Sequence, residues 1–171
     1  MTTADQAVDE PWTIVVSPQA LDTITVEVAL GGVRLETGGI LLGHDDPTSR
    51  TTTITDAGEP GPNAVRETAH FSRDRQHAER LAQRAWDSHR AQWVGEWHTH
   101  IRDAPAPSKA DLATYAMHLH DPELRFERFV ALIVAVCPDQ PAVLVAWLVD
   151  THTARQVPLR PTQEESSASN L

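Results

Sequence analysis

Apolar side chains recur with helical spacing between residues 74 and 90. Ala78, Leu81, Ala82, Ala85 and Trp86 follow one another at i, i+3, i+4, i+7 and i+8, with mostly polar residues between them. This spacing places the apolar side chains on one side of a helix, where they can pack against a core. The pattern predicts an amphipathic helix over residues 74–90.

Two more helices are predicted from their position and the residues at their ends. Ser17 and Pro18 supply a capping side chain and a first-turn proline, and Gly31 and Gly32 supply a stop. Together they predict a helix from residue 17 to about residue 30. A third helix is expected over residues 108–120, after a loop that contains two prolines.

Short apolar or alternating runs bounded by turn residues predict strands. These runs cover residues 12–16, 36–43, 51–57, 93–100, 129–136, 142–149 and 155–159, and a further strand is expected to close at residues 70–71. A turn across residues 45–47 makes a hairpin, and the prolines of residues 59–63 predict a loop. Helices alternate with strands in the first half, which favours an α/β fold with a mixed β-sheet flanked by helices.

The length of 171 residues fits one domain. We expect this domain to span residues 12–160, with a disordered N-terminus over residues 1–11 and a disordered polar tail over residues 161–171. No apolar run approaches the roughly 20 residues of a membrane-spanning helix, and residues 1–11 lack the layout of a secretion signal. The predicted location is the cytoplasm, with no membrane partner.

Charge and cysteine content exclude several functions. The formal net charge of −10 argues against nucleic acid as the main partner, because neutralising phosphates requires basic patches. Cys137 is the only cysteine, which excludes a disulfide framework and a cysteine-rich zinc site. Its position in an apolar run predicts a buried thiol.

His98 and His100 lie two residues apart on a predicted strand. Their side chains therefore leave the same face and can converge on one metal ion, while Trp97 points to the opposite face and is expected in the core. His118 and His120 have the same spacing inside a predicted helix, where positions i and i+2 point in different directions. That second pair is not expected to bind a metal.

Asp111 offers a third ligand. Ser108 and Asp111 are three residues apart on the first turn of a predicted helix, which places both on one side. The plainer interpretation is a helix cap, since a serine followed three residues later by an acidic residue commonly starts a helix. Both interpretations can hold together. Asp103 is a competing ligand, but it lies in a loop whose direction no pattern fixes.

Two imidazoles and one carboxylate leave the fourth position of a tetrahedral zinc ion open for water, as in catalytic sites. Such a water has its pKa lowered to about 7 and becomes a nucleophile at neutral pH. A proton acceptor is then required. Glu36, close to two glycines, is the candidate, and a solvated charge at a strand edge is the alternative interpretation of this residue.

At these positions the sequence resembles the JAMM (MPN+) zinc metalloproteases. Their signature is a glutamate in an upstream strand, then His-x-His, seven residues, a serine, two residues and an aspartate. This chain has the same gaps with Glu36, His98, His100, Ser108 and Asp111. Many relatives carry a proline after the second histidine, where this chain has Ile101. The resemblance implies a cytidine-deaminase-like α/β fold.

The resemblance also implies a role for each residue. His98, His100 and Asp111 would bind one zinc ion (Zn2+). Glu36 would take a proton from the bound water and return it to the leaving amine. Ser108 would donate a hydrogen bond to the oxyanion of the tetrahedral intermediate.

Three further phrases are similar to the stand-alone bacterial branch of this family. They are residues 36–43 (ETGGILLG), residues 61–65 (GPNAV) with Phe71 and Asp74, and residues 95–100 (GEWHTH). Members of that branch occur beside E1-like and E2-like enzymes in anti-phage operons of the CBASS or ubiquitin-like conjugation type. The resemblance implies an isopeptidase that removes a ubiquitin-like or similarly attached protein from its conjugate.

Two other functions stay open at this point. A peptidase that trims a small sulfur-carrier protein would use the same zinc chemistry. A catalytically inactive scaffold would have lost a ligand or the base, whereas all five signature positions are present. A cytidine deaminase is excluded, because its Pro-Cys-x-x-Cys motif needs two cysteines. The His-Glu-x-x-His motif of other zinc proteases is absent.

Overall fold

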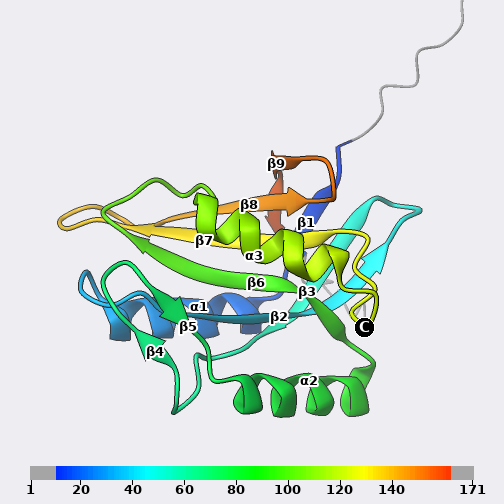
Figure 1. The fold of residues 1–171 in the computed structure, drawn as a ribbon, viewed down its shortest axis with the longest axis horizontal. Coiled ribbons are helices and arrows are strands. Elements are labelled where there is room, and N and C mark those ends of the chain that lie inside the picture. The colour runs from blue at the N-terminus through cyan, green and yellow to red at the C-terminus, as the bar shows by residue number, and fades with distance from the viewer. Residues whose placement is uncertain (1–10, 163–171) are drawn as a thin grey trace, which may run out of the picture.

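The computed structural model describes residues 11–162 (Figure 1). The predicted disorder of residues 1–10 and 163–171 lies outside the described residues. The elements follow one another in the order β1 (Thr13–Val16), α1 (Pro18–Gly31), β2 (Gly38–Asp46), β3 (Thr51–Ala57), β4 (Val65–Arg66), β5 (Phe71–Ser72), α2 (Arg75–His89), β6 (Gln92–Ile101), α3 (Lys109–His120), β7 (Phe129–Val136), β8 (Val143–Val149), β9 (Ala154–Val157) and β10 (Leu159–Pro161).

Eight strands form one mixed sheet in the order β10-β1-β3-β2-β6-β7-β8-β9, and β4 pairs with β5 in a separate ribbon. β1 runs parallel to β3 and β10, β6 runs parallel to β7, and the other neighbours are antiparallel. The predicted α/β fold with a mixed sheet flanked by helices is confirmed. β2 and β6, which lead to the candidate site, occupy the centre of the sheet.

The three predicted helices are confirmed, with Ser17 and Ser108 as the expected caps and Asp74 as a cap that was not predicted from the sequence. Ser17, Asp74 and Ser108 are the N-caps of α1, α2 and α3, and each side chain accepts a hydrogen bond from a backbone N–H three residues later. Such caps stabilise a helix because the first backbone N–H groups have no partner inside the helix.

Three local predictions differ from the structure. The turn expected at residues 45–47 lies at residues 47–50, because β2 stays paired with β3 as far as Asp46. Cys137 is half-buried, because it directly follows the last residue of β7. Residues 155–159 form two strands, β9 and β10, separated by Pro158. A proline has no N–H to donate, so it interrupts a strand ladder.

The two edge strands of the large sheet are joined by this single proline. β9 pairs with β8, and β10 pairs with β1 at the other edge. The carbonyl oxygen of Pro158 accepts a hydrogen bond from the N–H of Ile14 at 2.9 Å. The sheet therefore curls until its edges meet at Pro158. β10 ends at Pro161, one residue inside the segment that the sequence assigned to the tail.

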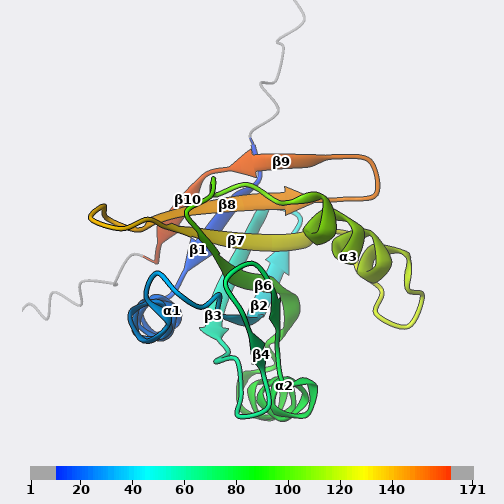
Figure 2. The same ribbon diagram turned by 60° about the vertical axis from the view of Figure 1, so that its left-hand side comes forward.

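Helices cover the two faces of the curled sheet differently. Trp97 and Leu41 belong to the main core, which α1 covers with Ala20 and Ile24. On the opposite face, α2 packs on β2, and α3 packs on β7 and β8. Figure 2 shows α1, α2 and α3 well apart from one another around the sheet. Within residues 11–162, no helix is long and apolar enough to cross a membrane.

Trp97 is the largest fully buried side chain, and its indole N–H donates to the carbonyl oxygen of Gly58 at 2.9 Å. We expect Trp97→Ala to lower the free energy of unfolding by about 3–5 kcal/mol, because it leaves a cavity in the core. Trp86→Ala, at a site 39% exposed, should cost about 1 kcal/mol or less. Urea unfolding measures both, and equal losses would contradict this account of the core.

Candidate metal centre

The central strand β6 presents both histidines on one face. His98 and His100 are buried, at 6% and 7% exposure. Trp97 and Thr99 point to the other face and are buried as well. The prediction that Trp97 lies opposite the histidines in the core is confirmed. Because side chains alternate along a strand, the core contacts of Trp97 aim the two imidazoles into the space between α2 and α3.

The N-terminus of α3 brings Asp111 to the histidines. Ser108 and Asp111 form a capping box, in which the Ser108 hydroxyl accepts from the Asp111 N–H at 3.1 Å. In return, Asp111 Oδ2 accepts from the Ser108 N–H at 2.7 Å. The same carboxylate contacts His100, so the helix cap also orients the side chain toward the histidines. Both sequence interpretations of this pair, cap and approach to the histidines, agree with the structure.

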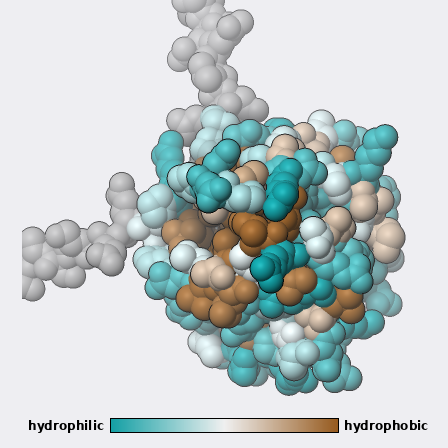
Figure 3. Space-filling model, turned by 90° about the vertical axis from the view of Figure 1, so that its left-hand side faces the viewer, coloured by the Kyte–Doolittle hydropathy of each residue, from teal (hydrophilic) through white to brown (hydrophobic). Residues whose placement is uncertain are grey.

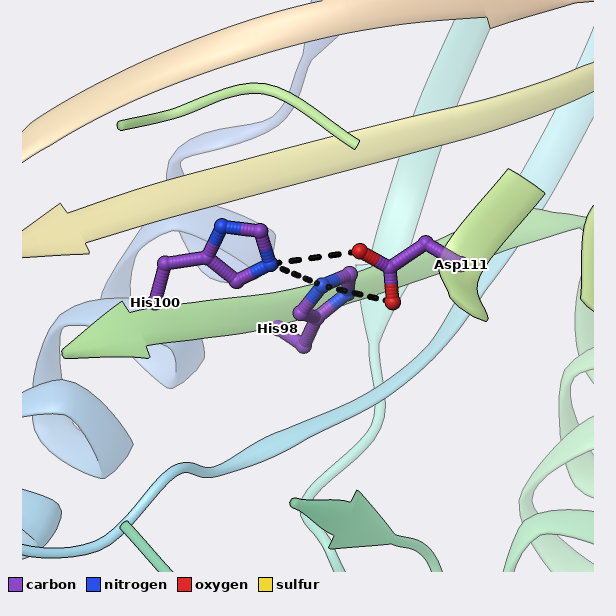
Figure 4. A group of neighbouring side chains, drawn as sticks. All are labelled: His98, His100 and Asp111. Carbon is purple, nitrogen blue, oxygen red and sulfur yellow. Dashed lines mark hydrogen bonds and ion pairs between the residues drawn. The ribbon is translucent and has the colours of Figure 1, made fainter. Parts of the chain in front are cut away.

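Three side-chain groups converge on one point (Figure 4). His98 Nε2 lies 3.0 Å from His100 Nε2 and 3.5 Å from Asp111 Oδ1, and His100 Nε2 lies 3.3 Å from Asp111 Oδ2. Two ligands at about 2.1 Å from a tetrahedral zinc ion lie about 3.4 Å apart. The residues therefore fit a zinc ion. Among residues 11–162, no other group of three histidine, cysteine or acidic side chains comes as close together.

Asp111 and His100 shift each other's pKa values toward the charged forms. Burial alone would raise the pKa of Asp111, but hydrogen bonds from His100 and His98 outweigh it and hold this pKa far below its usual value. Burial would likewise lower the pKa of His100, and contacts with Asp111 and the carbonyl of Ala104 raise it instead. An ionised carboxylate beside two imidazoles is the arrangement that attracts a divalent cation.

Glu36 lies two residues before β2, and its prediction as a strand residue was wrong. Its N–H donates at 2.8 Å to the carbonyl oxygen of Glu67, between β4 and β5, so it is not part of the β2 ladder. The next residue remains aligned with β6, because the N–H of Thr37 donates to Thr99 Oγ1 at 2.9 Å.

The pairing of Gly38 with His98 sets the register of β2 against β6. Continuing that register places Glu36 opposite His100, on the face of the histidines.

Glu36, Ser108 and the three converging residues line one cavity of about 590 Å³. Burial raises the pKa of Glu36 above its ordinary value, and the imidazoles of His100 and His98 oppose this rise in part. A carboxylate with a raised pKa beside a candidate metal site has the basicity that a general base needs at neutral pH.

The other candidates from the sequence lie apart from the point of convergence. Asp103 lines the cavity, but its carboxylate accepts from the N–H of Ala104 and does not join the group. His118 stacks on Phe129, and His120 is exposed with its ring bonded to the carbonyl of Ala116. The two rings therefore have different surroundings, and the expectation that this pair does not bind a metal stays a prediction.

The loop after β6 takes a defined path without the proline that many relatives have. Ile101 is the last residue of β6, pairs with Val136 and is buried. The carbonyl oxygen of Ala104 lies 2.9 Å from His100 Nδ1, and that of Pro105 accepts from the indole N–H of Trp147 at 2.9 Å. These contacts carry the chain to the start of α3.

Two charged residues of the cavity were missed as functional candidates by sequence reasoning. Glu96 lies at 2.9 Å from Arg73, and both side chains face the cavity beside His98. The alternation of β6 contained the signal, because residues 96, 98 and 100 share one face.

Comparison with protein families matches residues 19–150 to the prokaryotic homologs of the JAB domain. The chain belongs to this family. The match includes all five signature residues, and the mixed sheet flanked by helices is consistent with the JAB/MPN fold.

Two further comparisons, one of sequences and one of structures, gave matches. A curated protein of Enterobacter hormaechei subsp. hoffmannii (strain UCI 50), called CD-NTase/cGAS isopeptidase, is 32% identical over 100 residues, or 58% of this chain. The match spans about half of that protein, at 54%. A protein from Desulfitobacterium hafniense, solved in solution, has a similar fold, with a TM-score of 0.65 at 16% identity over 88% of this chain and 94% of that one.

Gly38 leaves room that His98 needs. A Cβ atom at this position would lie 2.8 Å from His98 Cβ and 2.8 Å from the ring of Phe71, and would collide with the carbonyl oxygen of Trp97. We expect Gly38→Ala to displace His98 and to weaken zinc binding at least tenfold. Gly31→Ala is the control, since its Cβ meets the flexible end of Arg66 at 3.1 Å. Equal zinc affinities by chelator competition would contradict this packing argument.

Proposed function

We propose that this protein is a zinc-dependent isopeptidase that removes a ubiquitin-like or similarly attached protein from its conjugate. The observation that carries the proposal is the convergence of His98, His100 and Asp111 within 4.8 Å, in a cavity that also holds Glu36. Two imidazoles and a carboxylate leave one tetrahedral position free, which distinguishes a catalytic from a structural zinc site.

Each residue has a step in the hydrolysis. A zinc ion held by His98, His100 and Asp111 would supply Lewis acidity, which makes water a better nucleophile at neutral pH. Glu36 accepts a proton as water adds to the carbonyl carbon, and it delivers that proton to the amine when the C–N bond breaks. The Ser108 hydroxyl, on the same cavity wall, donates a hydrogen bond to the oxyanion.

A protein substrate is supported by the relative and by the surface. The curated relative is called an isopeptidase. Leu35, directly before Glu36, is 42% exposed, and Val65 of β4 is 48% exposed. The face of the molecule in Figure 3 also gathers apolar side chains. Exposed apolar groups beside a catalytic cavity suit contact with another protein.

The pathway around the enzyme is part of the proposal. The sequence phrases shared with the stand-alone bacterial branch favour E1-like and E2-like enzymes as partners, anti-phage defence as the setting and the cytoplasm as the location. A sulfur-carrier substrate would require the same residues, so the substrate experiment below separates the two functions. The inactive-scaffold alternative loses support, because the base and all three candidate ligands face one cavity.

The zinc content of purified variants distinguishes a metal ligand from the proposed general base. Asp111→Ala should lose the bound zinc, because it removes the one carboxylate of the converging group. Glu36→Ala should keep one zinc per chain and lower kcat by about 10²–10⁴-fold. Asp103→Ala is the control, and it should keep both the bound zinc and the wild-type kcat. Elemental analysis of the purified variants measures the zinc, and an unchanged zinc content in Asp111→Ala would refute the assignment.

Fusions of candidate ubiquitin-like proteins, each extended by a reporter peptide at its C-terminus, test the substrate. Zinc-loaded wild type should release the reporter at the C-terminus of a ubiquitin-like protein, and Glu36→Ala should not. Release from a sulfur-carrier fusion alone would establish the alternative function. Absence of cleavage by zinc-loaded protein on every fusion and on an isopeptide conjugate would contradict the proposed activity.

A further inference from the structure

Glu96 occupies the position on β6 two residues before His98, and its side chain is 14% exposed. Its two oxygens face different partners. Oε2 accepts a hydrogen bond from Arg73 Nη1 at 2.9 Å, and Oε1 lies 3.8 Å from His98 Nδ1. The carboxylate therefore stands behind the His98 ring, on the side away from Asp111.

The two histidines need partners behind their rings. When Nε2 binds a metal, Nδ1 carries the remaining ring proton, and an acceptor for this proton fixes the tautomer and the ring orientation. For His100 the acceptor is the carbonyl oxygen of Ala104, 2.9 Å from Nδ1. For His98 the structure places Glu96 beside Nδ1.

We propose that Glu96 is a positioning residue of the metal site, which orients His98 through its Nδ1–H while Arg73 holds the carboxylate. The inference rests on the metal site of the proposed function. A separation of 3.8 Å exceeds a hydrogen bond, so the proposal includes a tightening of this contact when His98 binds a cation.

Two neighbouring side chains lie beside the Glu96 carboxylate. Arg73 lies between β5 and α2, and its guanidinium stacks over the ring of Trp93 at 5.3 Å. From α3, the buried phenol of Tyr115 stacks on Phe129. Burial, and next the charge of Glu96, raise the pKa of Tyr115, which keeps its hydroxyl a donor. Arg73 therefore pairs with the carboxylate directly, and Tyr115 lies close enough for the charge of Glu96 to affect its pKa.

This location also separates Glu96 from the proposed base. Glu36 approaches from just before the start of β2, opposite His100, whereas Glu96 pairs with Arg73 behind His98. An imidazole ring therefore stands between the Glu96 carboxylate and the point where the three candidate ligands meet. Glu96 acts through His98 and does not touch the reacting atoms.

The test compares zinc dissociation constants of wild type, Glu96→Gln and Glu79→Gln by competition with a chromophoric chelator. Glutamine keeps the size of the side chain and removes its charge. Glu79 is the matched control, since it also pairs with an arginine, Arg75 at 2.8 Å, but is 61% exposed on α2. The d–d absorption spectrum of the Co2+-loaded proteins reports the ligand geometry, and melting of the chelator-treated proteins reports stability without metal.

We expect Glu96→Gln to bind zinc about ten- to hundredfold more weakly than wild type and to change the cobalt spectrum, with Glu79→Gln unchanged in both. If Glu96→Gln does not fold, the double variant Arg73→Gln/Glu96→Gln replaces it, because it leaves neither charge unpaired. Zinc affinity within twofold of wild type and an unchanged cobalt spectrum would overturn the proposal, whatever the melting temperature. Absence of zinc binding by wild type would instead overturn the metal site itself.

Discussion

The alternation of side chains along β6 is the constraint on which the candidate site depends. Trp97 is fully buried and donates a hydrogen bond to Gly58, so its direction is fixed. Adjacent residues must then point the other way, which sends Glu96, His98 and His100 toward the cavity. A slip of one residue would place a histidine in the apolar core and the indole in the cavity. The core contacts of Trp97 thereby specify the direction of both imidazoles.

The start of α3 fixes the position of the third candidate ligand, Asp111. The hydrogen bonds that cap the helix also fix the Asp111 carboxylate, so one local motif serves both stability and the site. In the loop between β6 and α3, the carbonyl oxygens of Ala104 and Pro105 form hydrogen bonds with His100 and Trp147. The site is therefore organised before any ion binds, and little conformational entropy remains to be lost on binding.

Local patterns predicted the parts of this structure that local physics determines. The period of two on β6 and the cap of α3 involve neighbours in the chain, and both were predicted from spacing alone. The exact place of Glu36 depends on hydrogen bonds to Glu67 and, through Thr37, to Thr99. The meeting of the sheet edges at Pro158 joins β1 to β10, far apart in sequence. Long-range pairings of this kind leave no periodic signal in the sequence.

Asp111 and the histidines are separated by a loop in the chain, and their convergence is the central claim about this protein. Anomalous X-ray diffraction from a crystal of the zinc-loaded protein tests it most directly. The account predicts one zinc ion per chain between Nε2 of His98, Nε2 of His100 and the Asp111 carboxylate, at about 2.0–2.2 Å from each. Zinc density elsewhere on the chain, or none at this point in a zinc-saturated crystal, would contradict it.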